Sequence, residues 1–151
     1  MRLEHLNIVV KELKPTINFY QAAFPHWKIR GGGVGEWHGV WRRWVHFGDD
    51  YTYLSLNDNG KNQNRDNKGY DVGLSHLAFV VDDIQSLMVR MQQAGYPIAI
   101  DGKGDPSYKS VYYLDPDGYE VEFLQYFTDI PDERNEYEPF DETLFSDIIT
   151  Q

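Results

Sequence analysis

Apolar residues in this chain recur either at every second position, as in a strand, or at helical spacing. A strand-like segment followed by a helix-like segment occurs twice. LEHLNIVV (3–10) alternates like a strand, and apolar residues at helical spacing follow it in a segment that Pro15 can open. LSHLAFVV (74–81) alternates in the same way and leads into a second helical segment, which Asp83 can cap and Gly95 can end. The pattern therefore predicts two strand–helix units.

An internal repeat with an offset of 71 residues (74 minus 3) relates these units. The identical pairs in the two strands are Leu3/Leu74, His5/His76, Leu6/Leu77, Val9/Val80 and Val10/Val81. Runs with the character of strands follow each helix, at 28–30, 40–47 and 51–57 and at 97–100, 109–115 and 119–126. We therefore expect an α+β fold of two βαβββ modules, with module one at 1–57, a polar linker at 58–73 and module two at 74–127. The run GGGVG (31–35) has no helix signal after it and predicts a flexible turn.

Residues two apart on a strand share a face, because successive side chains point to opposite sides. In 3–10 the aliphatic residues at even positions suit packing against a helix, which leaves His5 on the other, concave face. The same alternation places His76 on the concave face of its own strand. On the last strand of module two, Val121 and Phe123 suit the helix side and Glu122 faces the concavity.

Two histidines from equivalent strands and a carboxylate from a third strand form a typical set of metal ligands. Imidazole nitrogen and carboxylate oxygen together suit Fe(II), Mn(II), Ni(II), Co(II) or Zn(II), and three protein ligands leave positions open for a substrate. A histidine on a strand is, however, more often an ordinary residue with its hydrogen bonds satisfied. The equivalence of His5 and His76 in the repeat, together with Glu122, favours the metal site.

The segment YYLDPDGYEVEFLQ (112–125) resembles the terminal hairpin of the vicinal oxygen chelate superfamily. This superfamily includes glyoxalase I, methylmalonyl-CoA epimerase, fosfomycin- and bleomycin-resistance proteins and type I extradiol dioxygenases. LEHLNIVV with the NFY that follows it, and GLSHLAFVVDDI, resemble the openings of the family's two modules. The resemblance spans module one, the linker and module two. It implies that the two sheets curl into a cup around a divalent ion held by His5, His76 and Glu122.

One position departs from the pattern of glyoxalase and epimerase relatives. Their fourth ligand, a Glu or Gln on the last strand of module one, falls on Ser55, whose hydroxyl is a poor ligand and too short to replace a carboxylate. Glyoxalase-type proton transfer uses Glu at both related positions, so Ser55 argues against a standard glyoxalase I. Dioxygenase relatives carry a further catalytic His near the strand of Tyr51 and Tyr53, for which His46 on the neighbouring strand is the nearest candidate.

The remaining triad resembles that of extradiol dioxygenases and fosfomycin-resistance transferases. Both groups commonly carry a substrate-contacting Tyr at the position of Tyr112, although a Tyr there is also a good strand former. The clustered Trp37, Trp41 and Trp44 can wall a pocket for a flat ligand or fill the interface of a homodimer. We expect Tyr112 and Glu122 to be catalytic. The expected contacts of a small-molecule substrate are Tyr53, Ser55, Arg43 and Trp44.

Charge restricts the partners of the chain. The sequence has 14 Lys+Arg and 24 Asp+Glu, for a net charge of -10, which disfavours binding to nucleic acids and to anionic membranes. The acidity is concentrated in a C-terminal extension, 128–151, which has eight acids and one base, whereas 1–127 has 16 acids and 13 bases. In this extension Leu144, Phe145, Ile148 and Ile149 lie at helical spacing and predict a short helix that docks on the body or on a partner. The absence of Cys and of a long apolar segment favours a cytoplasmic location.

These features together predict a divalent-metal-dependent enzyme acting on a small substrate with two neighbouring oxygens. The reaction stays open between lyase or isomerase chemistry and extradiol-type dioxygenation. The alternative is a non-catalytic protein of the bleomycin-resistance type, which sequesters a ligand in an aromatic cleft.

Overall fold

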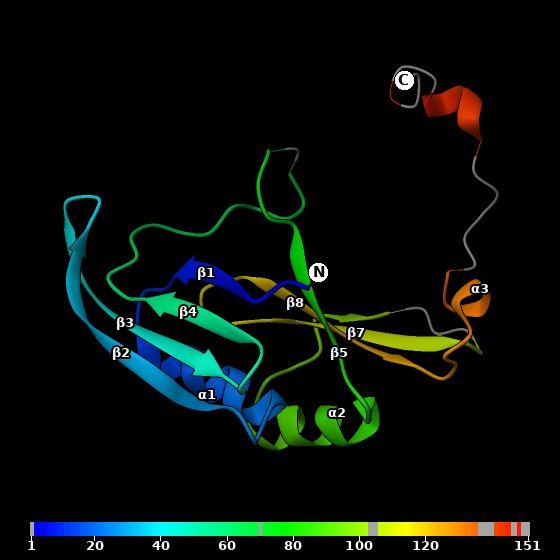
Figure 1. The fold of residues 1–151 in the computed structure, drawn as a ribbon, viewed down its shortest axis with the longest axis horizontal. Helices are drawn as coiled ribbons and strands as arrows, with labels where there is room; N and C mark the ends of the chain where they lie inside the picture. Colours follow the sequence, from blue (N-terminus) through cyan, green and yellow to red (C-terminus); the bar gives the residue numbers. More distant parts are fainter. Residues whose placement is uncertain (1, 70, 103–105, 136–140, 146–147, 149–151) are drawn as a thin grey trace.

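The computed structural model describes residues 2–69, 71–102, 106–135, 141–145 and 148, and forms two four-stranded mixed sheets (Figure 1). The first sheet has the order β1 (His5–Val9), β4 (Tyr53–Asn57), β3 (Val40–Gly48) and β2 (Lys28–Trp37). The second has the order β5 (His76–Val80), β8 (Glu120–Tyr126), β7 (Tyr108–Leu114) and β6 (Ile100–Asp101). In both sheets the first two strands named are parallel and the other neighbours are antiparallel. The expected α+β fold of two βαβββ modules is confirmed.

The helices α1 (Leu13–Ala23) and α2 (Ile84–Gln93) pack on one side of the sheets and against each other (Figure 1). They cover the apolar faces that alternation predicted, including Val10 in module one and Val121 and Phe123 in module two, all at most 1% exposed. Asp83 caps α2 as expected, since its carboxylate accepts a hydrogen bond from the Ser86 amide at 2.9 Å. The opposite side of each sheet is therefore left for polar chemistry.

An aromatic cluster joins the two modules. The Phe24 ring at the end of α1 lies 5.0 Å from the Phe79 ring on β5 and 5.7 Å from the Phe123 ring on β8, both edge to face. Arg90 on α2 donates hydrogen bonds to the carbonyl oxygens of Ala22 and Ala23, at 3.2 and 2.9 Å. These contacts make the two modules share one hydrophobic core.

The prediction of a flexible turn at GGGVG was wrong. Residues 31–35 lie inside β2, which pairs with β3 along its whole length in a ribbon that curves away from the helices (Figure 1). A Cβ atom at position 32 would lie only 2.5 Å from the Trp44 carbonyl oxygen, which is too close. Gly32 has no side chain, so β2 can pair with β3 at this position. The glycines thus allow close contact between two strands.

The C-terminal extension begins with α3 (Pro131–Arg134) and continues to a short 3₁₀ helix, Glu142–Phe145. This helix lies away from both sheets (Figure 1), and the side chains of Leu144 and Ile148 are 72% and 71% exposed. The predicted docking of these residues on the body is therefore not observed, while Ile149 lies outside the described residues. Docking on a partner stays a prediction.

Asp115 fixes the turn that leads into β8. Its Oδ1 accepts hydrogen bonds from the amides of Asp117 and Tyr119, both at 2.9 Å, and Gly118 takes a left-handed φ of 82°. The side chain is only 4% exposed, and its Oδ2 has no hydrogen-bond partner in the described part of the chain. Burial raises the pKa of Asp115 from its ordinary 3.8 to about 6.

This shift predicts a pH-dependent loss of stability. Between about pH 4 and pH 6 the folded chain keeps the Asp115 proton that the unfolded chain has lost, so the free energy of unfolding should fall by about 3 kcal/mol as pH rises. The Asp115→Asn variant keeps an acceptor oxygen and should not show this fall. Urea unfolding of both proteins at several pH values isolates the difference. Asp117→Asn, two residues away, is the control and should retain most of the fall, because burial contributes more to the shift than the charge of Asp117 does. A fall that persists in Asp115→Asn would contradict the assignment.

Candidate metal and substrate site

Two predicted ligands meet on the concave face of the second sheet. His76 on β5 and Glu122 on β8 come within 3.5 Å, measured from Nε2 to Oε2, although Glu122 is in register with Ala78 rather than with His76. Their side chains are 41% and 14% exposed. They line an open hollow of about 640 Å³ together with Tyr112, Ser110 and other residues of β6, β7 and β8. An imidazole nitrogen and a carboxylate oxygen are thus held side by side beside a space of substrate size.

Tyr112 lies directly opposite Glu122 in the β7–β8 ladder. Burial, together with a hydrogen bond to Glu122 and the charge of that carboxylate, raises the pKa of the Tyr112 phenol to about 12. The phenol therefore stays protonated at neutral pH and donates to Glu122. The ring also contacts His76 edge to face, with centroids 5.7 Å apart. Tyr112 is thus placed to orient the carboxylate and to donate a proton or hydrogen bond.

The third predicted ligand, His5, lies on the first sheet. Its Nδ1 is 2.9 Å from Glu4 Oε2, and a proton on Nδ1 leaves the lone pair on Nε2. The ring stacks on Tyr53 at 4.8 Å, with an angle of 16° between the planes. Arg30 lies over the same Tyr53 ring at 4.5 Å.

His46, the nearest candidate for the additional histidine of dioxygenase relatives, lies on β3 of the first sheet. It is in register with Ser55, so its side chain shares the concave face with the position where relatives carry a fourth ligand. Its ring lies 4.5 Å from that of Tyr53 and 5.0 Å from that of Trp44. Burial lowers the pKa of His46, and the neighbouring His5 and Arg30 lower it as well. The alternation of side chains along β3 could have identified His46, because it lies two residues from Trp44 and therefore on the same face.

The triad does not meet within one chain. No three His, Asp or Glu side chains among the residues that the structure describes lie close enough together to hold a metal ion. His5 contacts Glu4 and Tyr53, whereas His76 and Glu122 contact each other. A single chain therefore presents two separate parts of the expected ligand set, and each part lies on its own sheet.

The four expected substrate contacts do not share one surface. Tyr53 and Ser55, 8% and 7% exposed, lie on the concave face of the first sheet, where Trp44 also lies. Arg43 alternates with Trp44 and therefore points to the opposite face. Its Nε is 2.5 Å from Oδ2 of the buried Asp58, so its charge is already paired. Of the other clustered aromatics, Trp41 is 65% exposed and shares the face of Arg43.

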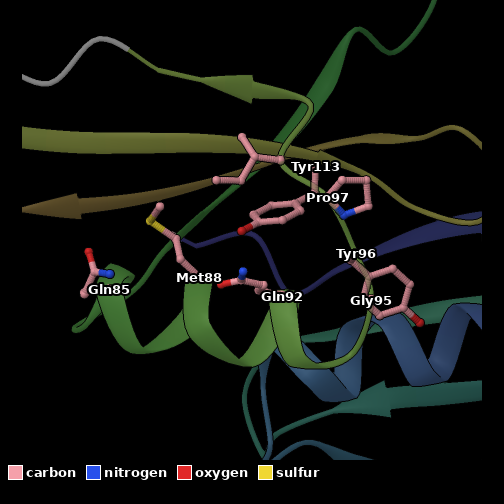
Figure 2. Close-up of a pocket in the computed structure, with 8 residues that line it drawn as sticks. Gln85, Met88, Gln92, Gly95, Tyr96, Pro97 and Tyr113 are labelled. Carbon is pink, nitrogen blue, oxygen red and sulfur yellow. The ribbon is translucent and has the colours of Figure 1, made fainter.

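A separate cavity of about 500 Å³ lies on the helix side of the second sheet, between α2 and the segment that follows it. Figure 2 shows Tyr113 pointing from β7 toward Met88 and Gln92 on α2. Tyr113 alternates with Tyr112, so this cavity lies on the opposite face from His76 and Glu122. It offers none of the predicted metal ligands.

The sequence matches the model of the Glyoxalase/Bleomycin resistance protein/Dioxygenase superfamily over residues 2–123. The chain belongs to this superfamily. A lactoylglutathione lyase of Neisseria meningitidis serogroup B is 30% identical over 131 residues, which cover 83% of this chain and 91% of that protein.

Solved structures agree on the fold of this glyoxalase-superfamily chain. The fosfomycin resistance protein FosX from Listeria monocytogenes, complexed with Mn(II) and sulfate, is similar with a TM-score of 0.63 and 20% identity, over 89% of this chain and 98% of that chain. An antibiotic binding protein from a Streptomyces species is similar with a TM-score of 0.58 and 20% identity, over 83% of this chain and 96% of that chain. Among the described residues, no helix has the length and apolar character needed to cross a membrane.

The contact between Tyr112 and Glu122 predicts a linked titration in the metal-free protein. The Tyr112 phenol should titrate at about 12, and Glu122→Gln should lower this pKa toward the ordinary 10.0 because the neighbouring negative charge is removed. Burial remains, so the return should be partial. NMR of ring-labelled tyrosines measures the titration, with Tyr112→Phe identifying the signal.

Glu120→Gln is the control for this measurement, since Glu120 makes only the smallest contribution to the shift of Tyr112. A titration of Tyr112 that does not move in Glu122→Gln would contradict the proposed contact.

Proposed function

We propose that this chain is a divalent-metal-dependent lyase or isomerase that acts on a small substrate with two neighbouring oxygens. The observation that supports this most is the approach of His76 Nε2 to Glu122 Oε2, at 3.5 Å, beside the protonated Tyr112. The similarity to a lactoylglutathione lyase favours lyase or isomerase chemistry over dioxygenation. The similarity to a Mn(II) complex of a fosfomycin resistance protein agrees with a divalent ion.

The donor atoms suit the ions named from the sequence. His76 supplies a nitrogen and Glu122 an oxygen, and the hydrogen bond from Tyr112 to Glu122 is the kind of outer contact that orients a ligating carboxylate. His5, whose Nδ1 faces Glu4, has Nε2 available as a third donor. When bound, the ion supplies Lewis acidity that stabilises negative charge on the substrate oxygens.

The residues of the chain then have distinct roles. Tyr112 holds a proton near the carboxylate and can donate it to substrate oxygen, because its phenol is neutral at physiological pH. Ser55 leaves the first sheet without the second Glu of a standard glyoxalase I, so proton transfer by two equivalent carboxylates is not proposed. Tyr53 and Trp44 offer ring faces on the concave side of the first sheet.

We further propose that the site is completed by a second copy of the chain. The two parts of the triad lie on different sheets and do not meet, so a partner that brings its first sheet to this chain's second sheet completes the ligand set. Such a homodimer has two equivalent sites by symmetry. Each site takes His5 from one protomer and His76 and Glu122 from the other.

Complementation between two variants tests this arrangement. His5→Ala and His76→Ala should each lose stoichiometric metal when alone. A mixed preparation should recover about one quarter of the wild-type metal content, because half of the dimers are mixed and each mixed dimer retains one of two sites. Metal analysis of protein purified without an affinity tag gives the measurement. His38→Ala, in the turn between β2 and β3, is the control and should bind metal normally.

Each other outcome has a definite meaning. Recovery of no metal in the mixture, with a full metal content in the wild type, would contradict the shared site. A wild-type protein that holds none of Fe(II), Mn(II), Ni(II), Co(II) or Zn(II) would contradict the metal-dependent enzyme. Oxygen uptake with catechol by the Fe(II) form would contradict lyase or isomerase chemistry and support dioxygenation.

A second function, ligand sequestration without chemistry, is favoured by one observation. Ser55 is 7% exposed and cannot act as the fourth carboxylate, while Tyr53 and Trp44 lie beside it on the same face. The similarity in fold to an antibiotic binding protein agrees with this alternative. Ligand binding by a wild-type protein that takes up none of the tested ions when they are offered would favour it.

A further inference from the structure

The concave face of the β2–β3 ribbon has two contrasting rows of residues. Arg42, Trp44 and His46 alternate along β3 and therefore share one face. Their register partners on β2 are Gly35, Gly33 and Gly31. A row of large polar and aromatic side chains thus runs beside a row with no side chains.

The glycine row leaves space at both of its ends. A Cβ atom at Gly31 or at Gly35 would have no other atom within 4 Å, whereas one at Gly33 would meet the Trp44 ring at 3.2 Å. The indole therefore lies on Gly33 and covers the middle of the row. Open space remains next to Gly35, which is the register partner of Arg42.

Arg42 carries a charge that the described residues do not neutralise. Its Nε and Nη1 are both buried and have no hydrogen-bond partner there. Arg43, the next residue, differs in this respect because Asp58 is 2.5 Å from its Nε. A guanidinium is always protonated, and burying its donors without an acceptor costs free energy, so this position favours an anion.

We propose that Arg42, with the open space beside Gly35, binds the carboxylate or another oxyanion group of the substrate. Trp44 then contacts the flat or apolar part of the same molecule. Arg42 is four residues from His46 along β3, which is roughly 13 Å at the rise of a strand. The proposal deepens the proposed function by naming an elongated, anionic substrate whose charged end lies away from the metal ligands.

Binding of benzoate and of its neutral analogue benzamide tests the proposal. The full chain is titrated after removal of metal with a chelator, so that no carboxylate–metal contact contributes, and the shift of the Trp44 indole N–H signal is followed by NMR. We expect benzoate to bind the wild type at least about tenfold more tightly than benzamide. Arg42→Gln should bring the ratio of the two dissociation constants to about one, and Arg42→Lys should retain part of the preference.

Two further variants separate anion binding from a structural role. Gly35→Val keeps the charge and favours the strand, yet it fills the open space, so it should weaken benzoate binding without loss of stability. Lys14→Gln removes one positive charge from α1, on the other side of the sheet, and should leave the preference unchanged.

A wild-type preference near one, or a full preference in Arg42→Gln, would overturn the proposal. Because the titration is made without metal, its result is independent of the complementation experiment. A preference for benzoate, in a protein that takes up none of the tested ions when they are offered, would support Arg42 and contradict only the metal-dependent enzyme. Metal binding without a preference for benzoate would support the metal-dependent enzyme and contradict the anion site at Arg42.

Discussion

The contact of Phe24 with Phe79 and Phe123 is the interaction on which the arrangement of the molecule depends. It joins the end of α1 to the second sheet, and the hydrogen bonds of Arg90 to the same end of α1 support it. Because this core occupies the helix side of both sheets, the candidate ligands His5, His76 and Glu122 lie on the concave faces. The core also fixes how the two modules sit within one chain, and thus keeps His5 away from His76 and Glu122.

The two concave faces have different chemistry. The second sheet holds a donor pair and a neutral phenol, His76, Glu122 and Tyr112. The first sheet holds aromatic rings and the Arg42 guanidinium, whose Nε and Nη1 have no hydrogen-bond partner among the described residues, and Ser55 stands where a carboxylate would extend the ligand set. This asymmetry suits a substrate that is held by its charged and flat parts on one sheet and by its oxygens on the other.

Neighbouring charged residues of the chain also differ in whether their charge is paired. The adjacent residues Arg42 and Arg43 on β3 point to opposite faces of the sheet, because side chains alternate along a strand. Arg43 pairs with Asp58, whereas Arg42 lies on the concave face. A net charge of -10 therefore coexists with a local site for an anion.

The sequence by itself determined the two βαβββ modules, the cap at Asp83 and the face of each strand that packs on a helix. These features depend on local period and on turn chemistry, which a single chain displays directly. Alternation likewise placed His5, His76 and Glu122 on concave faces. Only the tertiary structure decided that GGGVG is a strand, since its conformation depends on pairing with β3 and on the room that Trp44 needs. It also decided which arginine is neutralised and which ligands meet, because both depend on distances between segments far apart in the sequence.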